Sequence, residues 1–505
     1  MKIPEDFNAA SYFIDRHDTE RPDKIAIECG GRRVTYRELF NGVNAVGSRL
    51  RGSGIRKGDR IILILPDTPE FAMSFFGAIK IGAIPVPLNP FLPPADYGYF
   101  FENSGARAVI AEEEFKNVLP SGAPDLDSGL IIMHAAEISR FQDGPGAAVL
   151  KAEPTKQDDP AFWLYSSGST GRPKACVHRQ RDMLVCSEHY AKGILNMTAD
   201  DRCFSASKLF FAYGLGNALY YPFAVGATSI LLPDRATPEK IFEVIGRYRP
   251  TLFFGVPTQY AGMIEGDGGQ AAGDGMKNIR ACVSAGEALP ALLFNKFKER
   301  FGHEILDSIG STEALQAFIS SRPGRIRVGA VGELIPGYEA KILDEQGKEA
   351  ADGAVGDLYV KNDAVCSEYW HEPEKTAATI RNGWLRTGDR FHKDADGYYW
   401  FVGRADDMFK SNGAWVSPVE VEQVIMRHPA VLESAVVGKK NAAGLMRPAA
   451  YVVLREDGFS KGLIEELGAW CAERLPMYKR PAWFEILPAL PKTATGKIQR
   501  FRLRI

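Results

Sequence analysis

The chain has 505 residues, with 61 Lys plus Arg and 63 Asp plus Glu, so its formal net charge is −2. This length predicts about two to four domains or subdomains, and near-zero charge argues against a general nucleic-acid-binding protein, which carries a basic surface excess. Glycine is the one enriched residue type, 50 of 505, about 10% against a usual ~7%. We therefore expect glycines at turns and where backbone approaches a ligand.

Alternating helices and strands are predicted in the first part of the chain. Helices are expected over Tyr36–Arg51 and Phe71–Ile81, and strands over Arg60–Leu65 and Ala83–Leu88. The pattern repeats from about residue 161 to 310, where apolar runs such as Phe162–Tyr165 end in loops of small residues. This alternation predicts a mostly parallel sheet covered by helices on both faces, with ligands beyond the carboxyl ends of the strands.

One uncharged stretch, Leu209–Pro233, is long enough to cross a membrane. Gly, Pro and Asn residues interrupt it, and its tyrosines lie within the segment rather than at two interfaces. We therefore expect a buried helix here, followed by a strand at Thr228–Leu232, beside a ligand pocket.

From about Val328 the sequence changes to short strands separated by Asp-Gly, Gln-Gly and Asn-Gly turns. After residue 403 a mixed α+β unit of about 100 residues follows, the size of a compact domain. Its predicted helices and strands are Pro418–His428, Glu433–Gly438, Ala449–Leu454, Leu463–Leu475 and Trp483–Leu487.

The predicted fold class is therefore α/β. A large N-terminal domain, residues 1–403, has sheets flanked by helices and a small β-rich subdomain at about 328–403. A small, mobile α+β domain, residues 404–505, follows a hinge at 404–407.

Cysteine usage and the N-terminus bear on location. The seven cysteines are scattered without a Cys-x-x-Cys pair, so neither a zinc ribbon nor a thioredoxin-type pair is indicated. The N-terminus lacks a basic region followed by an apolar run, and no signal peptide is predicted. We expect a cytoplasmic protein.

The sharpest motif is Tyr165-Ser-Ser-Gly-Ser-Thr-Gly-Arg-Pro-Lys174, which follows an apolar strand. Its hydroxyls, two glycines and lysine suit a phosphate group, although the spacing is not that of a Walker A loop. The alternative is a polar surface turn. The predicted phosphate contacts are Ser166, Ser167, Gly168, Ser169, Thr170, Gly171 and Lys174.

This segment resembles the phosphate loop of the adenylate-forming superfamily: acyl- and aryl-CoA synthetases, carrier-protein adenylation domains and luciferases. Each of the short strings is weak alone, but six in the family's order are strong, and the chain length fits. The chain is identified as a member of this superfamily. The five further strings are Ser284-Ala-Gly-Glu287, Gly310-Ser-Thr-Glu313, Leu385-Arg-Thr-Gly-Asp389, Gly403-Arg-Ala-Asp-Asp407 and Pro491-Lys-Thr-Ala-Thr-Gly-Lys497.

The resemblance implies an ATP site. Thr312 would lie near the α-phosphate, and Glu313, with Thr170, would bind Mg²⁺, a hard cation that prefers oxygen ligands. Asp389 would accept the ribose hydroxyls, and Arg404 would pair with ribose or phosphate oxygens. The remaining nucleotide contacts would be Ala285, Gly286, Glu287, Asp307, Ile309, Gly310 and Ser311.

Lys497 is the main catalytic residue that the resemblance implies. It would bridge the substrate carboxylate and the α-phosphate, because attack of one anion on another requires charge to be neutralised. Asp406 is the position at which relatives swing the small domain, although the segment also reads as a charged interdomain linker. A rotation there would withdraw Lys497 and admit coenzyme A, whose predicted contacts are Lys410, Ser411, Asn412, Gly413 and Trp415.

The segment Lys208–Asn217 resembles the substrate pocket of benzoate-CoA ligases. Gln316 stands where benzoate-type ligases often carry His; its amide could bind a ring hydroxyl or amino group, or equally satisfy a backbone group. Benzoate, 4-hydroxybenzoate, 2-aminobenzoate and other acids therefore stay open. The predicted pocket residues are Ala212, Tyr213, Gly214, Ala285, Ile309, Gly310 and Gln316.

The predicted function is that of an AMP-forming acid–thiol ligase. It would use ATP, Mg²⁺ and coenzyme A to convert an aromatic acid to aryl-AMP and then to aryl-CoA. The alternatives are an adenylation enzyme that loads a carrier-protein pantetheine, and a non-catalytic nucleotide-binding homologue. We expect no nucleic-acid or membrane partner, and the oligomeric state, monomer or dimer, stays open.

Overall fold

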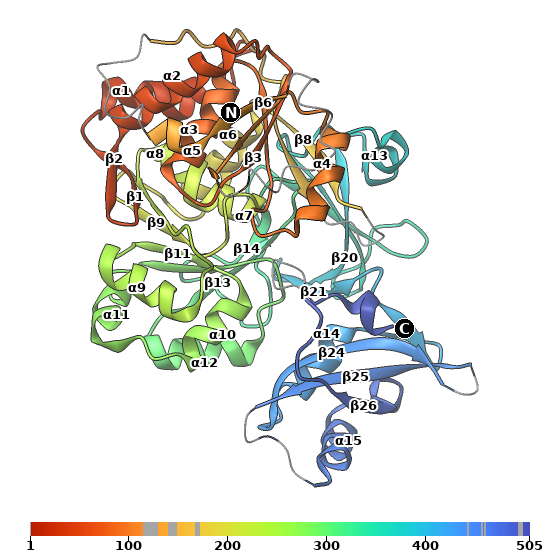
Figure 1. Ribbon diagram of the computed structural model, residues 1–505. Helices are drawn as coiled ribbons and strands as arrows, with labels where there is room; N and C mark the ends of the chain where they lie inside the picture. The colour runs from red at the N-terminus through yellow and green to blue at the C-terminus, as the bar shows by residue number, and fades with distance from the viewer. Residues whose placement is uncertain are drawn as a thin grey trace.

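A computed structural model describes residues 2–113, 115, 130–139, 149–166, 172–441, 444–455, 458, 461–492 and 498–504. Part of the predicted phosphate loop, residues 167–171, and the predicted catalytic Lys497 lie outside the described residues. Figure 1 shows a large upper part, coloured red to cyan, and a smaller blue part below it that ends at the C-terminus.

A parallel four-stranded sheet of strand order β4-β3-β5-β6 forms the first layer. Helices α2 (Tyr36–Gly52) and α3 (Pro69–Lys80) pack against each other, and α2 begins with a capping box between Thr35 and Glu38. The predicted helices and strands are present; α3 begins earlier than predicted, with a proline at its first position, which suits a helix start. The strands are β3 (Arg60–Ile64), β4 (Ile84–Pro87), β5 (Ala108–Ala111) and β6 (Ile131–His134).

The second sheet has nine strands in the order β15-β14-β13-β12-β11-β9-β10-β1-β2. Its central strands, β13 to β1 in that order, pair in parallel, and apolar clusters cover both of their faces. The predicted two-sided α/β sheet is thus confirmed here. The strands are β1 (Ile25–Cys29), β2 (Arg32–Thr35), β9 (Arg202–Ser205), β10 (Thr228–Leu231), β11 (Leu252–Gly255), β12 (Ala281–Ser284), β13 (Ile305–Gly310), β14 (Ala317–Ser320) and β15 (Glu333–Leu334).

Four helices cover one face of this sheet, at the lower left of Figure 1. They are α9 (Pro238–Tyr248), α10 (Pro257–Glu265), α11 (Gly269–Met276) and α12 (Ala291–Phe301).

The run at Phe162–Tyr165 differs from the prediction. It lies in β7 (Pro160–Ser166), which pairs antiparallel with β8 (Lys174–Arg179), and β18 (Glu368–Tyr369) adds a third strand. The prediction of a parallel strand was wrong here. Both faces of β7 are buried, so its sequence is a continuous apolar run like that of a parallel strand.

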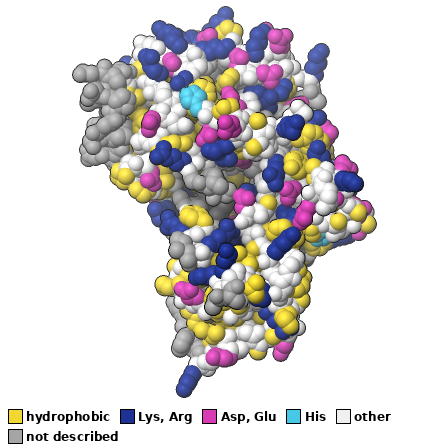
Figure 2. Space-filling view, turned by 90° about the vertical axis from the view of Figure 1, so that its right-hand side faces the viewer, with side chains coloured by type: hydrophobic (Ala, Val, Ile, Leu, Met, Phe, Trp, Pro, Cys, Tyr) yellow, Lys and Arg dark blue, Asp and Glu magenta, His cyan; other side chains and the backbone are white. Residues whose placement is uncertain are grey.

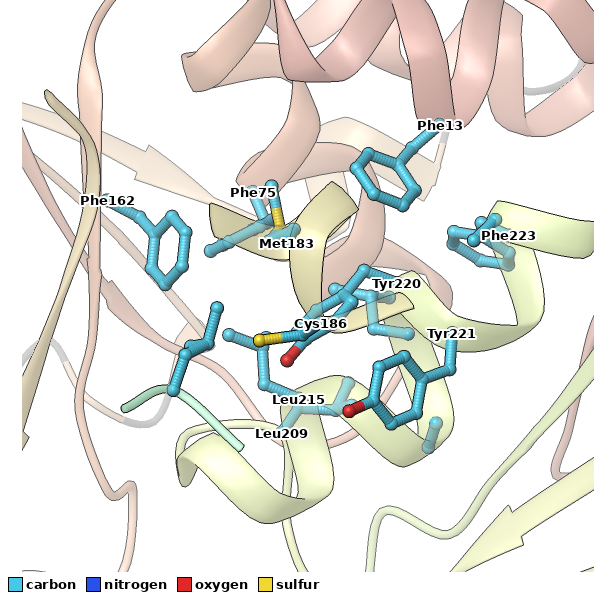
Figure 3. Packing of buried hydrophobic residues seen from close by; sticks show 14 of the residues in the cluster. Phe13, Phe75, Phe162, Met183, Cys186, Leu209, Leu215, Tyr220, Tyr221 and Phe223 are labelled. Carbon is cyan, nitrogen blue, oxygen red and sulfur yellow. The ribbon is translucent and has the colours of Figure 1, made fainter. Parts of the chain in front are cut away.

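The uncharged stretch Leu209–Pro233 is buried in the core. It contains α7 (Ala212–Leu215), a π-helical turn at Gly216–Tyr220, α8 (Tyr221–Val225) and then β10. Figure 3 shows Leu209, Leu215, Tyr220, Tyr221 and Phe223 among core side chains from distant elements. The predicted buried helix and strand are confirmed, and among the described residues no helix combines the length and apolarity needed to cross a bilayer.

The β-rich region follows as predicted from its turns. Its five-stranded sheet runs β16-β17-β20-β19, and β21 pairs with β20. A short helix, α13 (Pro373–Thr379), lies beside it. The strands are β16 (Glu339–Leu343), β17 (Gly356–Lys361), β19 (Ile380–Arg381), β20 (Trp384–Lys393) and β21 (Tyr399–Arg404).

The last part of the chain has its own apolar core around a three-stranded sheet, β24-β25-β26. In Figure 2 a narrower waist joins it to the large part, and Lys and Arg side chains gather beside that waist. Its elements are β22 (Phe409–Ser411), β23 (Ala414–Val416), α14 (Pro418–Ile425), β24 (Val431–Lys440), β25 (Met446–Leu454), α15 (Leu463–Arg474) and β26 (Trp483–Ile486).

Candidate active site

Glu313 lies where three distant segments meet. The Ser166 hydroxyl, at the end of β7, donates to Glu313 Oε1 at 3.1 Å, across 147 residues of sequence. The Tyr369 hydroxyl, from β18, donates to the same oxygen at 2.8 Å. Burial first, and then the nearby Glu313 carboxylate, raise the pKa of Tyr369 well above its ordinary value, so the phenol keeps the proton that it donates.

Lys174 joins this group from the first position of β8. Its Nζ lies 4.0 Å from the centre of the Tyr369 ring. The structure therefore brings together Ser166, Lys174 and Glu313, which the sequence predicted to act on one phosphate chain. Tyr369 was not predicted: it belongs to a two-residue strand without a motif of its own.

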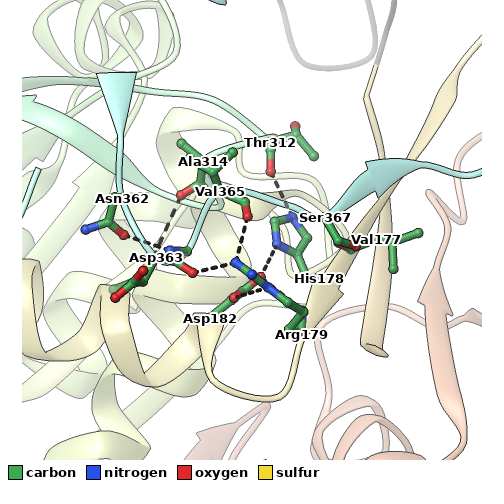
Figure 4. A network of polar contacts seen from close by, with 12 residues as sticks. Val177, His178, Arg179, Asp182, Thr312, Ala314, Asn362, Asp363, Val365 and Ser367 are labelled. Atoms are coloured by element: carbon green, nitrogen blue, oxygen red, sulfur yellow. Dashed lines mark hydrogen bonds and ion pairs between the residues drawn. The ribbon is translucent and has the colours of Figure 1, made fainter. Parts of the chain in front are cut away.

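The backbone around Glu313 is anchored from behind. The Thr312 carbonyl accepts a hydrogen bond from His178 Nε2 at 2.9 Å, and the Glu313 carbonyl accepts one from the Cys366 amide at 2.7 Å. Sequence reasoning missed His178 as well, although it lies only four residues after Lys174. Figure 4 shows it with its partners.

Asp389 and Arg404, the predicted ribose and phosphate contacts, face each other on β20 and β21. Arg404 Nη1 donates to Asp389 Oδ1 at 2.9 Å. Gly388 takes φ +74°, and a Cβ there would lie 3.0 Å from Arg404 Nη2. Desolvation disfavours the charge of Arg404, but the carboxylates of Asp389, Asp406 and Glu313 outweigh it and raise its pKa. This pair therefore lies within the electrostatic reach of Glu313.

The predicted adenine residues follow two neighbouring parallel strands. Ser284, the last residue of β12, pairs with Asp307 on β13, so Ala285–Glu287 leave the sheet beside the second half of β13, Asp307–Gly310. Gly310 must be glycine, because a Cβ there would lie 2.3 Å from the Gln316 carbonyl oxygen. Asp307 is buried, which raises the pKa of its carboxyl.

Gln316 is hydrogen-bonded to the backbone of the predicted aryl pocket. Its Nε2 donates to the carbonyls of Ala212 at 2.8 Å and Tyr213 at 3.2 Å, at the start of α7. The Tyr213 hydroxyl in turn donates to the Val283 carbonyl at 3.1 Å. Of the two roles weighed for Gln316, the contact with backbone groups is thus present at its amide nitrogen.

The predicted coenzyme A hairpin is placed elsewhere. Lys410–Trp415 forms the β22–β23 hairpin, with Asn412 and Gly413 at positive φ in its turn. Trp415 Nε1 donates to Glu345 Oε1 at 2.7 Å, beyond the end of β16. The structure thus sets this hairpin against the β-rich region.

The segment that follows Lys497 contacts helix α14 and the predicted hinge. Arg500 pairs with Glu422 at 2.7 Å. Burial opposes the charge of Arg500, but the carboxylates of Glu422, Asp407 and Glu287 raise its pKa. The charge of Glu287, a predicted nucleotide contact, thus acts on Arg500. Arg504 donates to the backbone carbonyl of the predicted hinge residue Asp406 at 3.0 Å.

Two protein-family models and a curated relative match this chain. The protein-family model described as AMP-binding enzyme matches residues 14–370, and the one described as AMP-binding enzyme C-terminal domain matches residues 420–497. A benzoate–CoA ligase from Thauera aromatica is 42% identical over 515 residues, which cover 100% of this chain and 97% of that protein.

Two solved structures are similar over their whole length. A benzoate CoA ligase from Burkholderia xenovorans LB400 is 42% identical with a TM-score of 0.90, covering 99% of this chain and 100% of that one. The anthranilate CoA ligase AuaEII, in complex with anthranoyl-AMP, is 38% identical with a TM-score of 0.92, covering 100% and 98%.

Proposed function

The chain belongs to the AMP-binding enzyme family, and we propose on this premise that it converts an aromatic carboxylic acid, ATP and coenzyme A to aryl-CoA, AMP and pyrophosphate. The observation that carries the proposal is the convergence of Ser166, Lys174 and Glu313 beside the Asp389–Arg404 pair. Relatives that act on benzoate and anthranilate support an aromatic acid as the substrate class.

The first half-reaction joins two anions. A carboxylate oxygen of the acid attacks the α-phosphorus of ATP, the bond from that phosphorus to the bridging oxygen breaks, and pyrophosphate leaves. Lys174 offers a positive charge beside Glu313, and Lys497 is the proposed second one, assigned from sequence. Fixed positive charges stabilise the negative charge of the transition state without reorganising during the reaction.

The Glu313 carboxylate is suited to binding a magnesium ion. Its Oε1 accepts two hydroxyl hydrogen bonds, which orient the carboxylate and leave further lone pairs for a cation. Mg²⁺ commonly takes one or two carboxylates together with substrate phosphates, so one glutamate is a sufficient protein ligand. When bound, the ion would neutralise charge on the phosphates.

The second half-reaction forms the thioester. The thiol of coenzyme A loses its proton to water, its sulfur attacks the carbonyl carbon of aryl-AMP, the carbon–oxygen bond to the phosphate breaks, and AMP leaves. Gly413, at φ +79° and with open space beside its Cα, leaves room for the pantetheine arm on the β22–β23 hairpin. The hairpin would have to leave Glu345 first, which supports Asp406 as a hinge.

The decisive experiment supplies benzoate, 4-hydroxybenzoate or 2-aminobenzoate with ATP and Mg²⁺, and either coenzyme A or a carrier protein. We expect pyrophosphate exchange that depends on the acid, and aryl-CoA in the coenzyme A arm. A thioester on the carrier protein alone would favour the carrier-loading enzyme, and exchange with none of the acids would favour a non-catalytic nucleotide-binding protein.

Two variants sharpen the assignment. Lys497→Ala should abolish adenylation and leave the reaction of supplied aryl-AMP with coenzyme A largely intact; equal loss of both would contradict the domain rotation. Gln316→His should change the ranking of the three acids. An unchanged ranking would mean that Gln316 serves only the backbone of α7.

A further inference from the structure

His178 is enclosed behind the Thr312–Glu313 segment. Its ring is fully buried and stacks on Phe162, with ring centres 5.1 Å apart and an interplanar angle of 18°. Nε2 lies 2.9 Å from the Thr312 carbonyl oxygen, and Nδ1 lies 3.2 Å from Asp182 Oδ2. The stacking and two hydrogen bonds fix the plane and the rotation of the ring.

Both polar partners of His178 are acceptors. A backbone carbonyl cannot donate, so Nε2 carries a proton toward Thr312. Asp182 accepts from the Arg179 amide at 3.0 Å and from Arg179 Nε at 3.2 Å, and these bonds hold its carboxylate beside His178 Nδ1. The ring is thus held from both sides, by Asp182 at Nδ1 and by the Thr312 carbonyl at Nε2.

Arg179 also connects this network to the segment that precedes Cys366. Arg179 Nη2 donates to the carbonyls of Asp363 at 2.5 Å and Val365 at 2.8 Å. The Val365 carbonyl belongs to the same peptide group as the Cys366 amide, which donates to the Glu313 carbonyl at 2.7 Å. Two consecutive carbonyls, those of Thr312 and Glu313, are thus bonded to one connected set of residues; Figure 4 shows the part of it around His178, Arg179 and Asp182.

We propose that His178 is a positioning residue for adenylation: by holding the Thr312 carbonyl it aims the Thr312 hydroxyl and the Glu313 carboxylate at the ATP phosphates. This inference rests on the proposed function. It gives Asp182 and Arg179 the role of holding the His178 ring in place. A rigid support matters because misplacement of a charged group by about 1 Å can cost on the order of 10²-fold in rate.

His178→Leu tests the proposal, because Leu fills much of the same space without hydrogen bonds. Acid-dependent pyrophosphate exchange should fall roughly 10- to 100-fold, because without this support Glu313 is displaced, and a displacement of about 1 Å can cost on the order of 10²-fold in rate. The reaction of supplied aryl-AMP with coenzyme A, which does not need Glu313 to bind Mg²⁺, should fall less than 3-fold or so.

The matched control is His17→Leu. His17 is also fully buried and also bonds a backbone carbonyl, that of Phe223 at 2.6 Å, but it lies in the N-terminal region. It should lower thermal stability while leaving the ratio of the two half-reactions unchanged. If His178→Leu behaves in the same way, with both half-reactions lowered equally, His178 is only a core residue and the proposal is overturned.

A rescue pair guards against a variant that fails to fold. His178→Gln alone directs an amide oxygen at the Asp182 carboxylate, whereas adding Asp182→Asn supplies an amide donor to it. The double variant should therefore recover at least 5-fold of the exchange rate lost in His178→Gln, and no recovery would count against the anchoring role. A wild-type enzyme without acid-dependent exchange would instead contradict the proposed function.

Discussion

His17 shows how a single buried group couples stability to pH. Burial is the main cause that lowers its pKa to about 4, and the Phe223 carbonyl and Glu20 only partly offset that effect and the charges of Arg16 and Arg21. In the unfolded chain the imidazole returns to its ordinary value. The unfolded state therefore binds one more proton between pH 6.5 and 4.

A histidine pKa that is lowered in the folded state makes the protein less stable as the pH falls. Above pH 6.5 His17 is neutral in both the folded and the unfolded protein, so it does not make stability depend on pH. As the pH falls toward 4, protonation of His17 in the unfolded chain lowers the free energy of unfolding by up to about 3 kcal/mol. We expect the unfolding midpoint of the wild type to decline more steeply between pH 7 and 5 than that of His17→Leu, by urea titration at each pH. Parallel declines in the two proteins would contradict the assignment.

At this scale, sequence predicted the residues that carry recognisable chemistry and missed those that support them. Ser166, Lys174 and Glu313 stand in strings whose composition suits phosphate and metal, and the structure brings them together. Tyr369 and His178 could not be identified in this way. Tyr369 comes to the site through the pairing of β18 with β8, which are far apart in sequence, and His178 contacts Thr312, 134 residues away. Neither residue type is unusual where it stands.

Hydrogen bonds at the first turn of helix α2 contribute to its stability. Thr35 Oγ1 accepts from the Glu38 amide at 3.2 Å, and Glu38 Oε2 accepts from the Thr35 amide at 2.7 Å. Thr35→Ala should lower the free energy of unfolding by about 1 kcal/mol, measured by urea titration, because one amide loses its partner.

Thr237→Ala is the matched control for that helix cap. Thr237 caps α9 through a single, longer bond of 3.4 Å to the Lys240 amide, so its loss should cost less. Equal effects of the two substitutions would mean that the reciprocal Glu38 contact adds nothing.

Elements with their own periodicity were predictable, and pairings were not. The helix over residues 36–52 follows from its apolar spacing and its polar start. The β7–β8 hairpin was read as part of a parallel sheet because burial on both faces removes the alternation that marks an antiparallel pair. Which strands pair, and in which direction, depends on the path of the chain between them, and amino-acid composition does not determine that path.

A hydrogen bond and an ion pair join the large N-terminal part of the molecule to the small C-terminal part. Trp415 Nε1 donates to Glu345 Oε1 at 2.7 Å, and Arg455 pairs with Glu265 at 2.7 Å. Between the β-rich region and the small domain lies a cavity of about 400 Å³, lined in part by Glu345, Arg390 and Trp415. The carboxylate of Glu287 contributes to the raised pKa of Arg500, which lies three residues after Lys497 in the sequence. We therefore expect this orientation to be the one used for adenylation.

Glu345→Ala should therefore shift the balance between the half-reactions. The bond to Trp415 would break when the hairpin turns toward the active site, so its loss removes about 0.5–1.5 kcal/mol that favours the orientation described. Acid-dependent exchange should fall by roughly 2- to 10-fold relative to the reaction of supplied aryl-AMP with coenzyme A.

Glu339→Ala is the matched control for this shift, because Glu339 pairs with Lys361 at 3.2 Å within the β-rich sheet and does not contact the small domain through that pair. It should leave the ratio of the half-reactions unchanged. The two variants should also have equal thermal midpoints, since both pairs are at the surface, where an ion pair or hydrogen bond adds little to stability. If both variants change the ratio alike, the contact with Trp415 does not set the orientation of the small domain, and the balance must depend on residues nearer the hinge, Asp406 first among them.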